Sequence, residues 1–310
     1  MTSTYSRAEA IDDDLADYLA LPGSAPLDYS TCTTQDVREQ FAANRKPTAV
    51  PAVHSITNSA FSGPGGAVAV RIYRMTDTLA PAILWFHGGG WVLGDLDTGE
   101  LPAQTLCHQT GCTVISVDYR LAPETPFPGA FDDCSAALQW VVDQAEELEI
   151  DPARITVGGD SAGGNLAATV ALAARDDGIV LAGQLLIYPV VQCDFTLPSF
   201  VEVGEGYGLV TEAMEWFWDK YVPNLSDRND PRVALLGQDL SGTAPAFVLT
   251  CGFDPLASEG LLYADALRMH GVPVTAVHQP SGIHGNFAMP KRSGVEGRSA
   301  AAIWVTDTLS

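Results

Sequence analysis

The sequence predicts an α/β fold built on a mainly parallel, doubly wound sheet. From about residue 65 onward, apolar β-rich runs alternate with helical patterns. Short runs such as ILWF, TVISV and LLIY lack polar alternation, which is typical of strands covered by helices on both faces. The 310 residues, 46% of them hydrophobic, can form a large core. We therefore expect one core with a modest appendage rather than two independent domains.

The elements of this fold can be bounded in chain order. A strand at 67–75 (AVAVRIYRM) is followed by one at 82–86 (AILWF), a helix at 101–109 and a strand at 112–117. A helix at 130–147, a strand at 154–158 and a helix at 162–175 come next, and a strand at 184–188 follows them. Beyond residue 240 we expect a strand at 246–250, a helix at 258–270, a strand at 274–279 and a last helix at 296–309.

Two stretches interrupt the alternation. Residues 1–50 carry a helical pattern before any strand, and residues 190–240 hold bulky aromatic residues among Gly and Pro. Aromatic residues in an insertion between two strands are typical of a cap over a site, or of a small separate core under a long loop. Composition alone leaves both readings open.

Charge and cysteine usage exclude several classes of partner. The 16 Lys and Arg against 38 Asp and Glu give a formal charge of −22, which repels nucleic acid and anionic membranes. The first 20 residues carry four aspartates where a secretory signal needs a basic start, so we expect a cytoplasmic protein.

The six cysteines form no CxxC pair and have no zinc-ligand spacing, so we expect reduced thiols and no metal.

The strongest motif is GDSAG at 159–163, which lies between the run ITVGG and the helical run AGGNLAATVALAAR. In this strand–turn–helix context, small residues allow a sharp turn that exposes the Ser161 hydroxyl at the carboxyl end of the sheet. Ser161 is therefore the candidate nucleophile.

A second motif, HGGGW at 87–91, directly follows the strand AILWF. Acyl transfer places negative charge on a carbonyl oxygen, and N–H groups fixed in advance stabilise it. We expect the amides of Gly88, Gly89 and Ala162 to form this oxyanion hole.

A serine nucleophile needs a base, and the base needs an acid to orient it. Of the six histidines, only His284 lies in a loop just beyond a predicted strand. The other five histidines belong to the glycine loop, to predicted strands or to predicted helices. These are His54, His87, His108, His270 and His278.

Asp254 follows the strand AFVLT and is the candidate that orients His284. Glu259 and Asp265, on the next helix, are interpreted as first-turn and surface charges. The chain order Ser161, Asp254, His284 matches the order that an α/β-hydrolase triad requires.

Together these motifs resemble the hormone-sensitive-lipase-like family of α/β-hydrolases, bacterial esterases that carry an HGGG loop and a GDSAGG elbow. The resemblance begins near residue 82 and includes HGGGW, DYRLAPE, GDSAGGNLA, Asp254-Pro255-Leu256 and His284-Gly285. It implies an α/β-hydrolase fold with a mostly parallel eight-stranded sheet flanked by helices. It also implies a helical cap from residues 1–50 and 191–240 over a core at 51–190 and 241–310. Asn286 departs from the pattern, because members often have Phe there.

The resemblance further implies a serine carboxylesterase that needs no metal or cofactor. It implies that Ser161 is the nucleophile, that His284 is the base and that Asp254 orients the histidine. The N–H groups that bind the oxyanion would be those of Gly88, Gly89 and Ala162. An amidase, deacetylase or lactone hydrolase with the same triad remains open. The presence of His284 argues against a non-catalytic ligand receptor of the same family.

We expect a small-molecule ester as substrate, with a short acyl chain. Trp91 follows the oxyanion loop and is expected to form the wall that limits the chain. The residues expected to contact substrate are Trp91, Tyr188, Trp216, Leu256 and Phe287. A homodimer through the last strand and final helix is a further implication of the resemblance.

Overall fold

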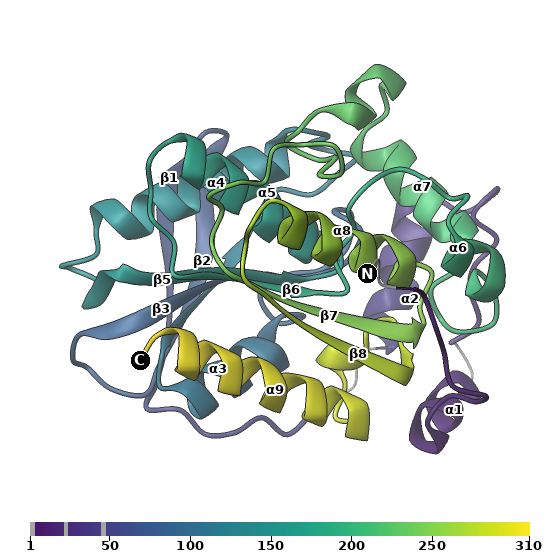
Figure 1. Cartoon of the computed structure of the whole chain (residues 1–310), viewed down its shortest axis with the longest axis horizontal. Helices are drawn as coiled ribbons and strands as arrows, with labels where there is room; N and C mark the ends of the chain where they lie inside the picture. The colour runs from purple at the N-terminus through teal and green to yellow at the C-terminus, as the bar shows by residue number, and fades with distance from the viewer. Residues whose placement is uncertain (1–3, 22–23, 45–47) are drawn as a thin grey trace.

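The computed structural model describes residues 4–21, 24–44 and 48–310 (Figure 1). Within these ranges eight strands form one sheet in the order β1-β2-β4-β3-β5-β6-β7-β8. The pairs β1–β2 and β2–β4 are antiparallel and the other five pairs are parallel. The predicted mostly parallel α/β sheet is confirmed.

The strands have the following bounds: β1 Ser55–Gly63, β2 Gly66–Arg74, β3 Ala80–Phe86, β4 Thr113–Asp118, β5 Ile150–Asp160, β6 Gly183–Ile187, β7 Ala246–Phe253 and β8 Val274–Ile283. The helices of the core are α3 Glu100–Thr110, α4 Gly129–Asp143, α5 Ala162–Asp176, α8 Ala257–Met269 and α9 Arg292–Thr308. The remaining helices are α1 Asp13–Leu19, α2 Thr34–Asn44, α6 Pro198–Val203 and α7 Thr211–Tyr221.

Helices cover both faces of the sheet. Figure 1 shows α3 and α9 on one face, with α4, α5 and α8 on the other. Along β3, Leu84 and Phe86 pack on the side of α4 and α5, whereas Ile83 and Trp85 pack on the side of α3 and α9. Since successive side chains of a strand point to opposite faces, a strand buried on both faces is apolar throughout. This explains the uninterrupted apolar runs.

Several boundaries differ from those predicted by three or four residues, among them the start of α9 at Arg292 and the end of β7 at Phe253. Helix α4 ends at Asp143, and β5 already begins at Ile150, because the chain turns and pairs with β3 before the apolar run starts. Strand β8 continues through Pro280 to Ile283, four residues beyond its apolar pattern, with a register shift against β7. The added residues bring the chain to His284.

Strand β1 was not among the predicted runs. It lies at the edge of the sheet, and its side chains are mostly exposed, as its sequence SITNSAFSG suggests. An edge strand whose side chains are mostly exposed lacks the apolar pattern by which buried strands are recognised.

Four helices lie beyond the carboxyl ends of β7 and β8, where α1, α2, α6 and α7 group together in Figure 1. Ser199 of α6 is tied to Ser258 of α8 by two reciprocal hydrogen bonds, in which each backbone N–H donates to the other hydroxyl oxygen at 3.0 Å. The Ser199 hydroxyl also donates to Pro255 O at 2.5 Å. These bonds fix α6 to the turn that follows β7.

No helix in the described ranges is long and apolar enough to cross a bilayer. All six cysteines are free thiols.

A buried carboxylate anchors the loop after β4 to α4. Asp133 is fully buried and accepts from the backbone N–H of Arg120 at 3.0 Å and from its Nε and Nη2 at 2.7 and 2.8 Å. Hydrogen bonds to a charged group are among the stronger ones in proteins.

We expect Asp133→Ala to lower the free energy of unfolding by about 2 kcal/mol, because it removes the buried acceptor of three Arg120 donors. The guanidinium is one-third exposed, so water replaces part of the lost interaction. Denaturant titration measures this loss. The neighbouring Asp132→Ala is the matched control and should cost less than about 1 kcal/mol. Equal losses in the two variants would contradict the assigned role of Asp133.

Candidate active site

Ser161 occupies the turn between β5 and α5 in a conformation that non-glycine residues rarely adopt. Its φ is 58° and its ψ is −119°. The turn is tight because α5 packs directly on the end of β3: a Cβ at Gly163 would lie 2.0 Å from Phe86 O. Glycine at 163 therefore permits the approach that holds Ser161 in this strained conformation.

Three side chains from three separate elements form a continuous hydrogen-bonded chain. Ser161 Oγ lies 2.9 Å from Nε2 of His284, and Nδ1 of His284 lies 2.9 Å from Oδ2 of Asp254. A carboxylate can only accept, so Nδ1 carries the proton and Nε2 of the neutral ring accepts from the serine hydroxyl. This arrangement allows His284 to take the proton from Ser161.

The carboxylate of this chain is held away from water. Asp254 is fully buried, and its Oδ1 accepts the backbone N–H of Leu256 at 2.8 Å. The ring of Tyr188 packs against the His284 ring, with centroids 4.6 Å apart. The imidazole is thus fixed both by a hydrogen bond and by packing.

The other histidines lie elsewhere, as their predicted elements imply. His278 is on β8, where its Nδ1 lies 2.8 Å from Thr250 Oγ1 and its Nε2 lies 2.7 Å from Ser6 O. His87 is fully buried beneath the glycine loop, and this burial lowers its pKa to about 4. His87 is therefore neutral at physiological pH.

The glycine loop differs from the prediction at Gly88. Its N–H donates to Oδ1 of Asp160 at 3.1 Å and so is not directed at a substrate. Within the described residues, the N–H groups of Gly89, Gly90 and Ala162 have no hydrogen-bond partner. Of the three amides expected to bind an oxyanion, those of Gly89 and Ala162 thus have no protein partner in the described residues, whereas that of Gly88 is bound to Asp160.

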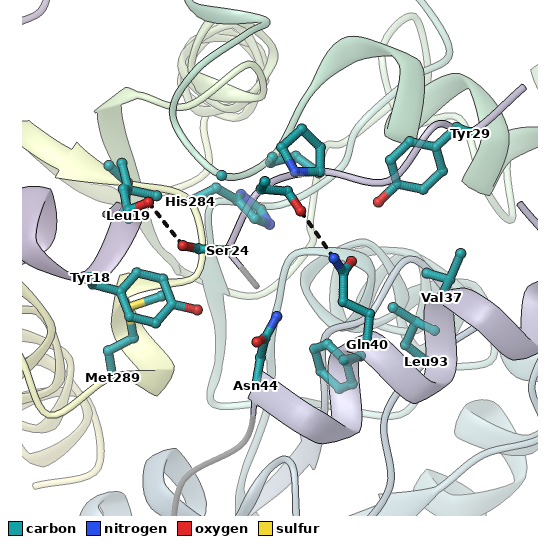
Figure 2. A pocket seen from close by; sticks show the side chains of 16 residues that line it. Tyr18, Leu19, Ser24, Tyr29, Val37, Gln40, Asn44, Leu93, His284 and Met289 are labelled. Atoms are coloured by element: carbon teal, nitrogen blue, oxygen red, sulfur yellow. Dashed lines mark hydrogen bonds between the residues drawn. The ribbon is translucent and has the colours of Figure 1, made fainter. Parts of the chain in front are cut away.

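A cavity of about 190 Å³ opens beside His284 (Figure 2). Most of its wall comes from described residues between Tyr18 and Asn44, and the rest comes from Leu93, Gly208, Leu209, Ile283, His284 and Met289. In Figure 2, Tyr18 and Met289 lie on one side, and Val37, Gln40 and Asn44 project from α2 on the other. The aromatic rings of the wall are Tyr18, Tyr29 and Phe41.

None of the five residues expected to contact substrate lines this cavity. Trp91 is fully buried and stacks on Tyr221 of α7, with ring centroids 4.5 Å apart. Phe287 packs on the opposite face of the sheet, stacked on Trp85 at 5.9 Å. Both side chains serve the core.

The other three lie closer to the site. Tyr188 packs on His284, and Leu256 is buried in the turn that binds Asp254. Trp216 packs against Tyr29, a residue of the cavity wall, with centroids 5.8 Å apart. All three side chains are buried.

Sequence reasoning misread Glu259. It is fully buried rather than a first-turn surface charge, and its Oε2 accepts the N–H of Gln192 at 3.1 Å. Burial raises its pKa well above the ordinary value, and the N–H groups of Gln192 and Val191 act in the opposite direction. Asp265, on the same helix, is also buried. The sequence carries no signal for this burial beyond the apolar residues that surround them.

Asn286 is a second residue whose role was not predicted. It is fully buried, and its Nδ2 donates to Oε1 of Gln279 on β8 at 2.8 Å. Arg298 of α9 donates from Nη1 to the carbonyls of Phe287 and Met289. The turn that follows His284 is therefore fixed to both β8 and α9.

No group of three or more His, Cys, Asp or Glu side chains in the described parts of the chain is arranged to hold a metal ion.

Comparisons with known proteins agree with this geometry. Residues 83–288 match a family described as the alpha/beta hydrolase fold. Carboxylesterase NlhH of Mycobacterium tuberculosis is 43% identical over 249 residues, which span 76% of this chain and 77% of that protein. Ethyl acetate hydrolase of Pseudomonas putida is 40% identical over 227 residues, 71% of each chain. The structure of a hyperthermophilic esterase from the archaeon Pyrobaculum calidifontis superposes with a TM-score of 0.87 at 34% identity, covering 96% of this chain and 98% of that one.

Because Trp91 packs α7 onto the glycine loop, we expect Trp91→Ala to destabilise the protein by about 3–5 kcal/mol, as large-to-small changes of buried aromatic residues do. Thermal or denaturant unfolding measures the loss. Trp304→Ala, at a half-buried tryptophan of α9, is the matched control and should cost less. A stable Trp91→Ala protein with an altered acyl-length preference would instead indicate a place in the substrate pocket.

Proposed function

We propose that this chain, which belongs to the hormone-sensitive-lipase-like family of α/β-hydrolases, cleaves its substrates with Ser161, His284 and Asp254. The chain is a carboxylic ester hydrolase. The observation that carries the residue assignment is the hydrogen-bonded series from Ser161 Oγ through His284 to Asp254, with both contacts at 2.9 Å.

In the proposed reaction, Ser161 Oγ attacks the ester carbonyl carbon as its proton passes to Nε2 of His284. The tetrahedral intermediate collapses when His284 returns this proton to the departing alcohol, which leaves an acyl-serine. Water, deprotonated by His284, then attacks the acyl carbon and releases the acid. Asp254 holds the ring in the tautomer that this sequence requires and stabilises the imidazolium.

The negative oxygen of each tetrahedral intermediate is proposed to bind the N–H groups of Gly89, Gly90 and Ala162. Ala162 is the first residue of α5, so its amide lies at the positive end of the helix dipole. Oxyanion donors of this kind typically contribute about 3–4 kcal/mol each to transition-state stabilisation.

We further propose that α1, α2, α6 and α7 form a cap over the site and that the cavity beside His284 receives a short acyl chain. The support is the wall of Tyr18, Tyr29 and Phe41, which bounds the cavity close to His284. Each buried methylene adds about 0.8 kcal/mol to binding only while there is space for it. This wall takes the place of Trp91, which packs in the core.

We expect Ser161→Ala and His284→Asn to remain folded and to lower turnover of a p-nitrophenyl ester by about 10⁴-fold or more, because each removes a member of the triad. The matched control is His278→Asn, which alters a histidine of the same strand region outside the chain of hydrogen bonds. It should stay within a few-fold of wild type. Near-normal turnover by Ser161→Ala, or an inactive His278→Asn beside an active His284→Asn, would refute the assignment.

The acyl preference is tested by kcat/KM for p-nitrophenyl esters with acyl chains from about two to about twelve carbons. We expect the highest values at about two to six carbons, and Phe41→Ala should shift the optimum to longer chains, because it opens the wall. Phe195→Ala, at a phenylalanine outside the cavity, should leave the profile unchanged. Values that rise steadily through the longest esters in wild type would exclude a short acyl pocket.

A further inference from the structure

The carboxylate of Asp160 connects the two glycine motifs of the site. Asp160 is the last residue of β5, directly before Ser161, yet its Oδ1 accepts the N–H of Gly88 in the other motif at 3.1 Å. The contact is close: a Cβ at Gly88 would lie 2.5 Å from Oδ2 and 3.0 Å from the backbone oxygen of Asp160. Residue 88 must therefore be glycine for the carboxylate to reach this amide.

Asp160 is buried, and the desolvation raises its pKa to about 6. The positive form of His284 and the Gly88 N–H both act in the opposite direction and favour the ionised carboxylate. Above neutral pH the group is thus an anion, and its bond to Gly88 is charge-assisted.

The other polar group of Gly88 is fixed as well. Its carbonyl lies 2.8 Å from Nδ1 of His87, whose own carbonyl accepts the Tyr119 hydroxyl at 2.7 Å. A carbonyl only accepts, so Nδ1 of the neutral His87 ring carries the proton.

These two anchors determine the direction of the next amide. The peptide bond between Gly88 and Gly89 is planar, and in a trans peptide the N–H points opposite to the C=O. With the Gly88 carbonyl directed at His87, the Gly89 N–H points away from that ring. The Gly88 N–H belongs to the preceding peptide, and its bond to Asp160 fixes that peptide and the Gly88 Cα from which the Gly88–Gly89 plane extends.

We propose that Asp160 is a positioning residue for oxyanion stabilisation: by accepting the Gly88 N–H it holds the Gly88–Gly89 peptide so that the Gly89 amide faces the reacting carbonyl oxygen. This inference rests on the proposed function, because it requires Ser161 to form a tetrahedral intermediate. Asp160 acts through Gly88 and does not touch the substrate. The required feature is the acceptor oxygen rather than the charge, since an anion this close to a developing oxyanion repels it.

Asp160→Ala and Asp160→Asn separate these two features. Alanine removes the acceptor, whereas asparagine keeps an oxygen that can accept from Gly88 and removes only the charge. For Asp160→Ala we expect kcat to fall by about 10- to 100-fold with KM within about two-fold, because the interaction is made in the transition state. For Asp160→Asn we expect kcat within about five-fold of wild type.

Inhibition by a trifluoromethyl ketone gives a second readout. Attack by serine converts such a ketone to a tetrahedral adduct whose oxygen is an oxyanion, so its inhibition constant reports on the oxyanion site. We expect the constant to rise in Asp160→Ala by about the factor by which kcat falls, and to change little in Asp160→Asn. A general loss of structure would not change kcat and the inhibition constant by the same factor while leaving KM unchanged.

Asp151→Asn is the matched control, because it removes a carboxylate from the opposite end of the same strand, where Asp151 pairs with Arg154. It should behave as wild type in both measurements. Ser161→Ala is measured in the same assay. If it retains activity, the proposed function is wrong. If it is inactive, the proposed function stands, and the Asp160 variants alone test whether Asp160 positions the Gly89 amide.

Two results would overturn the role of Asp160. The first is an Asp160→Ala enzyme whose kcat and ketone inhibition both match wild type. The second is a folded Asp160→Asn enzyme with a loss of 10-fold or more, about the loss expected for alanine, which would assign the effect to the charge. The second result stands even if Asp160→Ala does not fold.

Discussion

The contact between the end of β3 and the start of α5 is the constraint on which the active site depends. Gly163 lies so close to the Phe86 carbonyl that no side chain fits there, and this approach forces the strained turn at Ser161. The same contact sets the position of the glycine loop, because that loop begins at His87, the residue after β3. One packing contact therefore places the serine and the loop with the candidate oxyanion amides relative to each other. Asp254 and His284 complete the arrangement from β7 and β8, whose carboxyl ends meet at the same edge of the sheet.

Much of this was predictable from the sequence, since buried strands and strand-end motifs leave local patterns. The apolar runs identified the central strands, and a parallel sheet brings their carboxyl ends together. His284 could be chosen over His278 by its position after the last strand, although that strand is longer than its apolar pattern. Strand β1 could not be found in this way, because its exposed side chains carry no period.

Where the contacts at the site differ from those expected, the difference concerns directions rather than positions. Gly88, Trp91 and Phe287 all lie in or beside motifs, but the direction of an amide or a ring depends on contacts made by distant elements. The Gly88 N–H is bound to a residue 72 positions away, and Trp91 packs on a helix that begins at Thr211. The cavity wall was missed for a related reason. Tyr18 of α1 and Gln40 and Asn44 of α2 are ordinary residues of partly exposed helices, and only the tertiary structure shows that they line one cavity with His284.

The division of the cavity between two parts of the chain has an evolutionary consequence. The residues that carry out the proposed chemistry all follow residue 85, whereas most of the cavity wall precedes residue 45. Substitutions of wall residues such as Tyr18 and Phe41 can therefore change the proposed acyl selectivity without replacing a member of the triad. The same segment is also bonded to the end of β8, where Ala8 and Asp12 donate to the carbonyls of Pro280 and Ser281, so its backbone course is tied to the histidine. Recombination that exchanges this leading segment would transfer the proposed selectivity only where the incoming segment keeps these bonds to β8.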